Sequence, residues 1–379
     1  MSSASRRIVI VNHSLRALGG GEVSTLAYYR AFEDLGFEPL LVSCETEQID
    51  AGRLRERFGW DGPLNLQYCR SESEIDALTR EAAGMLNHSF HHDRAYPCRW
   101  SAYSVMFPHG YFRDSRGRCR HAGLRQYGRF LCNSQFTADY VAAIWGDDLP
   151  TTVLSPPFDL TGAPEPATKR NLIAHIGRFG IDGHTKNQQT LIAMMSRLWG
   201  DRALPADARL RLMGSVDHRP ENLNECRRLQ REALGLPIEF GFNLPRHELQ
   251  RTLGEASIYV HATGYSADEM IPPQCCEHFG IAILEAMSAG CVPVVFARGG
   301  AVDFVEHGRN GFLFLDADQA GRQIAWLLQH PAERERMAER AIETSRRYRY
   351  EDFRERLATI LNRSRLPIEQ PAQTVGAGA

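Results

Sequence analysis

Short hydrophobic runs alternate with longer amphipathic stretches in the first 160 residues of the chain. Four of these runs have the length and composition of buried strands, with helical patterns between them: 7–12, 39–43, 104–107 and 129–133. Runs of this kind, without regular polar positions, are typical of strands that are covered on both faces. The alternation therefore predicts a parallel sheet with helices on its faces.

The same rhythm restarts after a proline-rich stretch that contains Pro156, Pro157 and residues 163–168, as in an interdomain linker. Beyond it the pattern predicts strands over 172–176, 209–213, 238–240, 258–261, 292–296 and 311–315. It predicts helices over 187–199, 221–234, 246–253, 317–328, 332–346 and 350–362. We therefore expect two α/β domains, followed by a disordered tail.

One helix start differs from the others, because Glu277 and Glu285 lie eight positions apart around an apolar stretch. From Phe279 to Met287 the only ionisable side chain is Glu285, and a helix that is apolar almost all round is normally buried. A buried carboxylate needs donors, from protein groups or from ligand hydroxyls. Gly280 would let a ligand approach the backbone, and a helix N-terminus suits a phosphate. The alternative is a surface helix whose two glutamates face water.

Composition favours a soluble globular protein of about two domains, since 43% of the 379 residues are hydrophobic and 24% are charged. No run of 18 apolar residues and no secretory signal pattern occurs, so we expect a cytoplasmic protein. The nine cysteines contain no C-x-x-C pair, so we expect free thiols. A net charge of −2 and the lack of a recognisable motif argue against a nucleic-acid partner.

Lysine is almost absent, because Lys169 and Lys186 are the only lysines among 44 basic residues. We hypothesise that a compact ammonium is required where lysine persists. Lys186 opens a predicted helix, and Arg178 follows the predicted strand just before it. Positive charge near helix N-termini opposes the helix dipole, so the two cations predict a bound anion such as a diphosphate. The alternative is a pair of solvated surface cations.

A glycine-rich turn, Gly19 to Glu22, follows the first predicted strand and precedes a helix. Consecutive glycines let backbone amides approach a phosphate or sugar, so Gly20 and Gly21 are candidate ligand contacts. The spacing matches neither the dinucleotide-binding G-x-G-x-x-G pattern nor the P-loop pattern. The alternative is a merely flexible loop.

Taken together and in this order, six motifs resemble the retaining GT-B glycosyltransferases of family 4, the glycosyl transferases of group 1. The motifs are Gly19–Glu22, Asn133–Thr137, Gly177-Arg178 with Lys186, the Glu277 and Glu285 pair, Glu285–Gly290 and Asn310–Phe312. The resemblance implies two Rossmann-like domains that bind a nucleotide sugar in the cleft between them. It implies an acceptor domain over 1–160, a donor domain over 161–348, a helix over 349–365 that returns to the first domain, and a tail over 366–379.

The resemblance also implies roles for residues of the donor domain. Glu285 would hold the ribose hydroxyls, Glu277 would contact hydroxyls of the donor sugar, and Arg178 with Lys186 would neutralise the diphosphate. Backbone amides of Phe279, Gly280 and Ile281 would face sugar and phosphate. The spacing between Arg178 and Lys186 is longer than in many relatives.

Two histidines complete the candidate site. His109 resembles the family histidine near the donor sugar and the reaction centre. His261 ends a predicted strand, where it could touch phosphate or sugar or could simply pack. His88, His91 and His92 have no ligand spacing that would support a metal site, and the family usually needs no metal, so we expect neither metal nor cofactor.

One arginine-rich stretch of the sequence bears on the acceptor. Between residues 94 and 129 there are eight arginines and one acid, Asp114, which gives 8 − 1 = +7. Such a field would attract an anionic acceptor or an anionic membrane at the inner face, whereas solvated surface arginines are the alternative.

These observations predict a retaining hexosyltransferase that uses a UDP- or GDP-sugar. We expect the nucleotide base near residues 239–243, and the acceptor to be a cell-envelope glycan, a lipid-linked sugar or a small-molecule glycoside. Because a fold does not determine a function, two alternatives stay open. They are an epimerase or phosphorolytic enzyme on the same fold, and a sugar-nucleotide-binding protein without turnover.

Overall fold

The computed structural model describes residues 5–15, 19–45, 52, 60, 62–89, 94–109, 123–160, 162–181, 185–267, 271–364 and 366. The chain forms two compact units, one comprising Met1–Pro157 with Tyr350–Ala379 and the other Phe158–Arg349. The first boundary therefore falls in the proline-rich stretch. The tail that we expect to be disordered, apart from residue 366, lies outside the described residues.

The first unit is built on a seven-stranded parallel sheet with the order β3-β2-β1-β4-β5-β6-β7. Its strands are β1 Arg7–Val11, β2 Glu38–Ser43, β3 Leu66–Tyr68, β4 Gly84–Asn87, β5 Ser101–Val105, β6 Arg129–Cys132 and β7 Thr151–Val153. Its helices are α1 Gly20–Asp34, α3 Glu72–Arg80, η2 Leu124–Gln126, α4 Gln135–Trp145 and α11 Tyr350–Arg363. This strand order is that of a Rossmann-type sheet.

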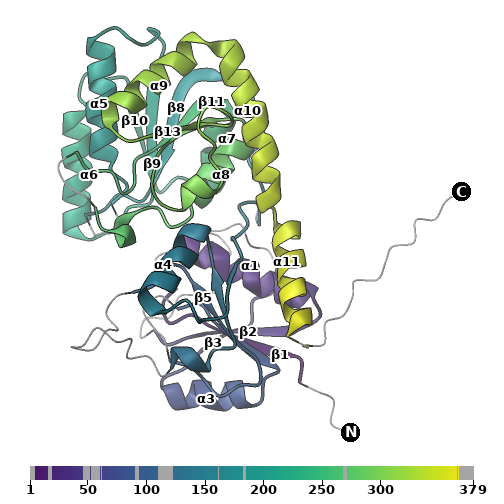
Figure 1. The fold of residues 1–379 in the computed structure, drawn as a ribbon. Helices are drawn as coiled ribbons and strands as arrows, with labels where there is room; N and C mark the ends of the chain where they lie inside the picture. Colours follow the sequence, from purple (N-terminus) through teal and green to yellow (C-terminus); the bar gives the residue numbers. More distant parts are fainter. Residues whose placement is uncertain are drawn as a thin grey trace, which may run out of the picture. The chain divides into compact units, whose positions relative to one another are not determined.

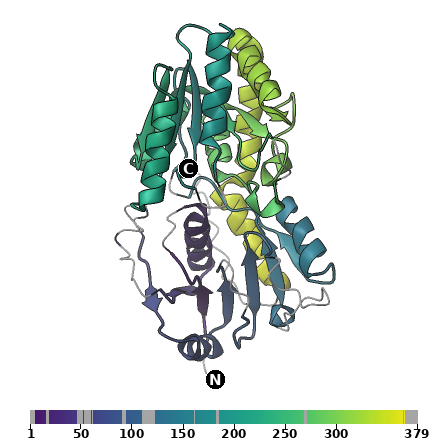
Figure 2. The ribbon, with the colours of Figure 1, turned by 90° about the vertical axis from the view of Figure 1, so that its left-hand side faces the viewer.

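The last helix, α11, packs against α1 of the first unit, although more than 300 residues separate them in the sequence (Figures 1 and 2). The Phe353 ring meets the Tyr28 ring edge-on with centroids 5.0 Å apart. The Tyr350 hydroxyl donates a hydrogen bond of 2.6 Å to Asp34, and the Arg30 guanidinium lies over the Tyr350 ring. The expected helix that returns to the first domain is thus confirmed.

The second unit repeats the architecture with a six-stranded parallel sheet of order β10-β9-β8-β11-β12-β13. Its strands are β8 Arg170–Ile176, β9 Arg209–Gly214, β10 Ile238–Phe242, β11 Ala256–His261, β12 Val292–Phe296 and β13 Phe312–Phe314. Its helices are α5 Gln188–Gly200, α6 Pro220–Glu232, α7 Arg246–Glu255, η3 Pro273–Cys275, α8 Ile281–Ser288, η4 Gly300–Asp303, α9 Ala317–Gln329, α10 Pro331–Ser345 and η5 Arg346–Tyr348.

Two apolar cores cover the two faces of this second sheet. Helices α5, α6 and α9 pack with one core, which includes Ile173 of β8. Helix α8 and the C-terminal part of α10 contribute to the other core, which includes the neighbouring strand residue Ala174. Because successive side chains of a strand point to opposite faces, the strands read as continuous apolar runs. The predicted two-domain α/β fold is confirmed.

The sequence pattern misplaced or missed several elements of the first unit. The strand expected over 104–107 is wrong, since β5 covers Ser101–Val105, and its serines Ser101 and Ser104 are buried despite their polarity. Strands β3, β4 and β7 are only three or four residues long and were not predicted. The expected glycine turn is also shorter than predicted, because α1 already begins at Gly20.

Candidate functional site

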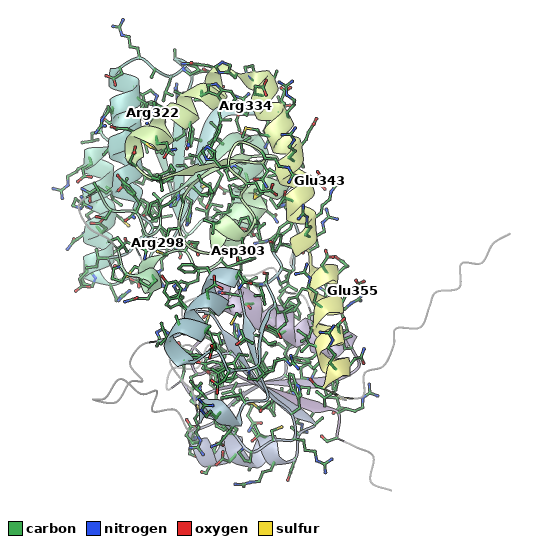
Figure 3. All side chains as sticks on the ribbon, in the orientation of Figure 1. Arg298, Asp303, Arg322, Arg334, Glu343 and Glu355 are labelled. Carbon is green, nitrogen blue, oxygen red and sulfur yellow. The ribbon has the colours of Figure 1, made fainter. Side chains whose placement is uncertain are left out.

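Helix α8 begins at a sharp turn that only glycines accommodate. Gly280 precedes the helix with φ of +106°, a left-handed conformation that strains other residues. A Cβ at Gly299 would lie 2.3 Å from the Glu277 carbonyl oxygen, and one at Gly300 would lie 2.1 Å from that of His278. Gly299 and Gly300 lie between Arg298 and Asp303, which Figure 3 labels. The close packing fixes the backbone just before α8, where first-turn amides have no acceptor within the helix.

The Glu277 carboxylate lies at the centre of a small polar cluster. Its Oε2 atom accepts a hydrogen bond of 2.7 Å from the Lys186 ammonium and one of 2.8 Å from Nε2 of His261. The Lys186 and Glu277 side chains are 18% and 16% exposed, so the ion pair is largely shielded from water. An oxygen that accepts two such bonds is held firmly in place.

The ends of two neighbouring strands, β8 and β11, supply neutral imidazoles beside this cluster. Burial lowers the pKa of His261, although its bond to Glu277 opposes that effect, so the neutral ring donates from Nε2. Burial also lowers the pKa of His175 to about 3, and its Nδ1 donates 2.9 Å to the Val260 carbonyl. The two rings lie 5.5 Å apart. Both histidines are therefore neutral at pH 7, and Lys186 supplies the positive charge of the cluster.

The loop between β8 and α5 positions Lys186. A Cβ on Gly177 would approach Cβ of Lys186 to 2.7 Å, so glycine is needed for the lysine stem to pass. The Gln188 amide donates bonds of 3.1 Å to the Gly177 and Arg178 carbonyls and ties the loop to the first turn of α5. Asn187, in a left-handed conformation, donates to the carbonyls of Ala262 and Tyr265 beyond β11. The long spacing before Lys186 thus does not stop it from reaching Glu277.

The second carboxylate of the pair, Glu285, is paired with an arginine from another helix. Nη2 of Arg246, the first residue of α7, lies 3.1 Å from Oε1 of Glu285. Only 16% of the Glu285 side chain is exposed. Burial raises the pKa of Glu285 above its usual value, and the nearby Arg246 guanidinium opposes that rise. The alternative of a helix whose glutamates face water is excluded, because protein donors hold both carboxylates.

Three other predicted site residues of the second unit are not joined to the polar cluster by a side-chain hydrogen bond or ion pair among the described residues. Arg178 is exposed, and no ion pair joins it to another described residue. Phe279 buries its ring against Phe304 and Tyr348, which leaves its backbone as the part that could meet a ligand. Ile281 is the first residue of α8.

Three predicted site residues belong to the first unit. Gly20 and Gly21 are the first residues of α1, and the His88 ring bonds to the Gly21 carbonyl over 3.1 Å. His109 is buried, and its carbonyl accepts a bond of 3.3 Å from the Trp145 indole. Because the polar cluster lies in the second unit, the roles of these three residues stay predictions.

Lys169, the other lysine, ties three chain segments together. Its ammonium donates to the carbonyl oxygens of Leu253, Ala256 and Ala289 at 3.2, 2.8 and 2.5 Å. These acceptors belong to the end of α7, the start of β11 and the residue after α8. Both lysines thus hold their ammonium groups against oxygen atoms of the second unit, and the requirement for a compact ammonium at these positions stays a prediction.

The arginine-rich stretch is only partly described, since residues 113, 116, 118 and 120 lie outside the described residues. Within the described part, Arg94 pairs with Asp76 at 2.7 Å and Arg125 with Asp148 at 2.5 Å. Among the described residues there is no group of three metal-ligating side chains and no helix long and apolar enough to cross a membrane. His91 and His92 fall outside them.

Sequence reasoning missed Arg246, His175 and the Gly299-Gly300 pair. A cation at the first position of a helix opposes the helix dipole, and this signal would have singled out Arg246 as it did Lys186. A histidine inside an apolar strand run marks His175. Nothing in the local pattern separates Gly299 and Gly300 from ordinary turn glycines.

Comparison with known proteins agrees with this architecture. Residues 161–344, nearly the whole second unit, match the family model of glycosyl transferases group 1. Among solved structures, HepE of Anabaena in complex with UDP has a TM-score of 0.72 at 16% identity, covering 94% of this chain and all of that chain. Sucrose-phosphate synthase of Thermosynechococcus elongatus has a TM-score of 0.67 at 15% identity, covering 94% and 98%. These similarities show the GT-B fold.

The curated relatives match a smaller share of this chain than the solved structures do. A GDP-Man:Man(3)GlcNAc(2)-PP-Dol alpha-1,2-mannosyltransferase of Dictyostelium discoideum is 26% identical over 59% of this chain and 45% of its own length. The human enzyme of the same name is 28% identical over 54% and 42%. The sulfoquinovosyl transferase of Arabidopsis thaliana is 25% identical over 62% and 42%. The chain thus spans less than half the length of these relatives.

Proposed function

We propose that this chain, a GT-B glycosyltransferase whose second unit belongs to the glycosyl transferases of group 1, transfers a hexosyl-type sugar from a nucleotide-diphospho sugar with retention of anomeric configuration. The observation that carries the proposal is the Glu277 carboxylate, held by Lys186 and His261 immediately before the N-terminus of α8. Carboxylate, ammonium and helix N-terminus match the three chemical parts of such a donor: sugar hydroxyls, phosphate charge and phosphate oxygens.

In the proposed complex each group of the second unit binds one part of the donor. Glu277 accepts hydrogen bonds from hydroxyls of the sugar, and Glu285 accepts those of the ribose. The amides of Phe279, Gly280 and Ile281 face the sugar and phosphate, where the helix dipole favours negative charge. Lys186 and the exposed Arg178 neutralise the diphosphate, and His261 orients Glu277.

The proposed reaction breaks the bond between the anomeric carbon and the diphosphate oxygen, and the electron pair of that bond stays on the phosphate. Lys186 and Arg178 stabilise this developing charge, which requires no proton transfer from them. The acceptor hydroxyl attacks the same face of the sugar, and its proton passes to the leaving phosphate. Glu277 is a poor nucleophile, since its Oε2 accepts two hydrogen bonds, so retention is assigned to this front-face route without an enzyme-bound intermediate.

The proposed donor is a UDP- or GDP-sugar, bound without a metal or other cofactor. The names of the mannosyltransferase relatives support GDP, and the UDP complexes of HepE support UDP. The proposed acceptor is a cell-envelope glycan, a lipid-linked sugar or a small-molecule glycoside, bound by the first unit with His109, Gly20 and Gly21 near the sugar. The lipid-linked class has support in the names of the same mannosyltransferases.

A thermal-shift screen with UDP-, GDP-, TDP- and ADP-sugars would identify the donor class. A ligand at 100 times its Kd stabilises the folded protein by about 2.7 kcal/mol, which is readily measured. Product analysis with and without acceptors then separates transfer from epimerisation, phosphorolysis and binding alone. If no sugar nucleotide stabilises the protein, the proposed donor site is wrong.

Turnover of site variants tests the residue roles. Lys186→Ala is expected to lower turnover at least about 100-fold, because a cation beside a developing anion contributes about 2.7 kcal/mol or more. Glu285→Ala is expected to lower turnover to a similar extent, because the ribose hydroxyls lose a charged acceptor, and a hydrogen bond to a charged group contributes about 1.5–3 kcal/mol. Glu343→Ala is the matched control, since Glu343 is an exposed glutamate of α10 (Figure 3). Near-normal turnover of the two site variants would contradict the assignment.

We also propose a peripheral contact of the first unit with anionic membranes, at the cytoplasmic face, through the arginine-rich stretch. Sedimentation with anionic liposomes at low and high salt tests this contact, because exposed charges are screened at high salt. Absence of binding at both salt concentrations would remove the membrane contact and leave the donor site unaffected.

A further inference from the structure

The ion pair between Arg246 and Glu285 links the start of α7 to the middle of α8. Nη2 of Arg246 lies 3.1 Å from Oε1 of Glu285 and also donates 2.9 Å to the carbonyl oxygen of Gly162. The Arg246 and Glu285 side chains are 24% and 16% exposed. No other described cation lies within ion-pair distance of Glu285, so its orientation depends on this arginine.

The position of Arg246 carries local costs. As the first residue of α7 after Pro245, its charge opposes the helix dipole. Its Nε atom is buried and has no acceptor among the described residues, and an unsatisfied buried donor is destabilising. The bond to the Gly162 carbonyl and the ion pair with Glu285 are the interactions that offset these costs.

A structural role alone does not account for the pair. Replacing a buried ion pair with apolar side chains of similar volume is often neutral or stabilising. Glu285 belongs to a largely apolar helix, since its chain neighbours Ile283, Leu284, Ala286 and Met287 are all buried. A carboxylate kept at this position, with an arginine to hold it, is therefore suited to binding a ligand that needs a fixed acceptor.

We propose that Arg246 is a positioning residue of the nucleotide site, which orients Glu285 to accept both hydroxyls of a ribose and so makes the protein select ribonucleotides over 2′-deoxyribonucleotides. The inference rests on the proposed function, because it takes the ligand of Glu285 to be a nucleotide. A vicinal diol offers two donors to one carboxylate, whereas a 2′-deoxyribose offers one. The selectivity depends on where the carboxylate oxygens point, and Arg246 determines this.

Isothermal titration calorimetry with UDP, dUDP, GDP and dGDP tests the proposal. Wild-type protein is expected to bind its preferred ribonucleotide about tenfold or more tightly than the deoxy form, as is typical for the loss of a hydrogen bond to a charged group. Arg246→Gln should reduce this ratio to within about twofold of unity. Arg246→Lys, which keeps the charge, should retain part of it, and Arg322→Gln on the exposed face of α9 should leave it unchanged (Figure 3).

The possible results distinguish a failure of this inference from a failure of the proposed function. A structural role for Arg246 would weaken binding of both nucleotides equally, so an unchanged ratio in Arg246→Gln would overturn the inference while leaving the nucleotide site intact. If the wild-type protein binds none of the four nucleotides, the proposed function itself fails. If Arg246→Gln does not fold, as judged by circular dichroism, the ratio in Arg246→Lys decides: a ratio equal to that of the wild type overturns the inference.

Discussion

Removal of the Lys186 ammonium separates the contribution of the Lys186–Glu277 pair to stability from its contribution to turnover. In Lys186→Met the Glu277 carboxylate keeps the His261 hydrogen bond and loses its cation. Breaking a buried ion pair by removing one partner costs about 3–5 kcal/mol. The two side chains are 18% and 16% exposed, and His261 remains, so we expect about 2–3 kcal/mol of destabilisation for this partly shielded pair.

The double variant Lys186→Met with Glu277→Gln removes the uncompensated charge. Its amide oxygen can still accept from His261, so the free energy of unfolding should return to within about 1 kcal/mol of the wild type. Turnover should stay at least about 100-fold low, because the cation beside the leaving phosphate is still missing.

Urea unfolding, followed by circular dichroism, and release of the nucleotide from the donor measure the two quantities on the same preparations. Lys169→Arg, a change at the other lysine, shows what a defect in stability alone does to turnover. An unchanged free energy of unfolding in Lys186→Met would refute the expected contribution of the Lys186–Glu277 ion pair to stability. Recovery of turnover in the double variant would refute the role of Lys186 at the phosphate.

Two further predictions concern stability. Lys169→Met should lower the free energy of unfolding by about 2–3 kcal/mol, because three carbonyl oxygens lose a charged donor; an unchanged urea midpoint would contradict this. His175 has a folded pKa of about 3 against 6.5 unfolded, so the unfolded state binds more protons, and its contribution is complete above pH 6.5 and declines as pH falls toward 3. His175→Gln should therefore reduce the slope of unfolding free energy against pH by up to about 1.4 kcal/mol per pH unit between pH 4 and 6. Equal slopes for variant and wild type, measured by urea unfolding at several pH values, would contradict this account.

The second unit could be predicted from its sequence more closely than the first. Its strands are buried on both faces and read as apolar runs, so Val292–Phe296 was predicted to the residue. In the first unit, β3 and β7 are edge strands whose residues stay partly exposed, and an edge strand of three residues leaves almost no periodic signal. The start of the central strand β5 was misplaced because Ser101 and Ser104 are polar. Their burial depends on partners that are distant in the sequence.

Residues of the site could be predicted where their charge is unfavourable in the local sequence, either within an apolar helix or at the start of a helix. Glu285 inside an apolar helix and Lys186 at a helix start both signal a partner, and the structure supplies one for each. Which partner could not be predicted, because Arg246 lies 39 positions before Glu285 and only the fold brings them together. Lys186 pairs with Glu277 within the protein, whereas the sequence pattern suggested only an external anion.

The scarcity of lysine gives the protein a built-in reporter for proteolysis. Both lysines lie in the second unit, and their ammonium groups are engaged with buried oxygen atoms. A protease that cleaves only after lysine therefore has two sites in the whole chain. It must draw each ammonium away from its oxygen partners before it can bind the side chain. The rate of digestion should therefore report local opening around these two residues of the second unit, and a bound nucleotide sugar should slow cleavage at Lys186.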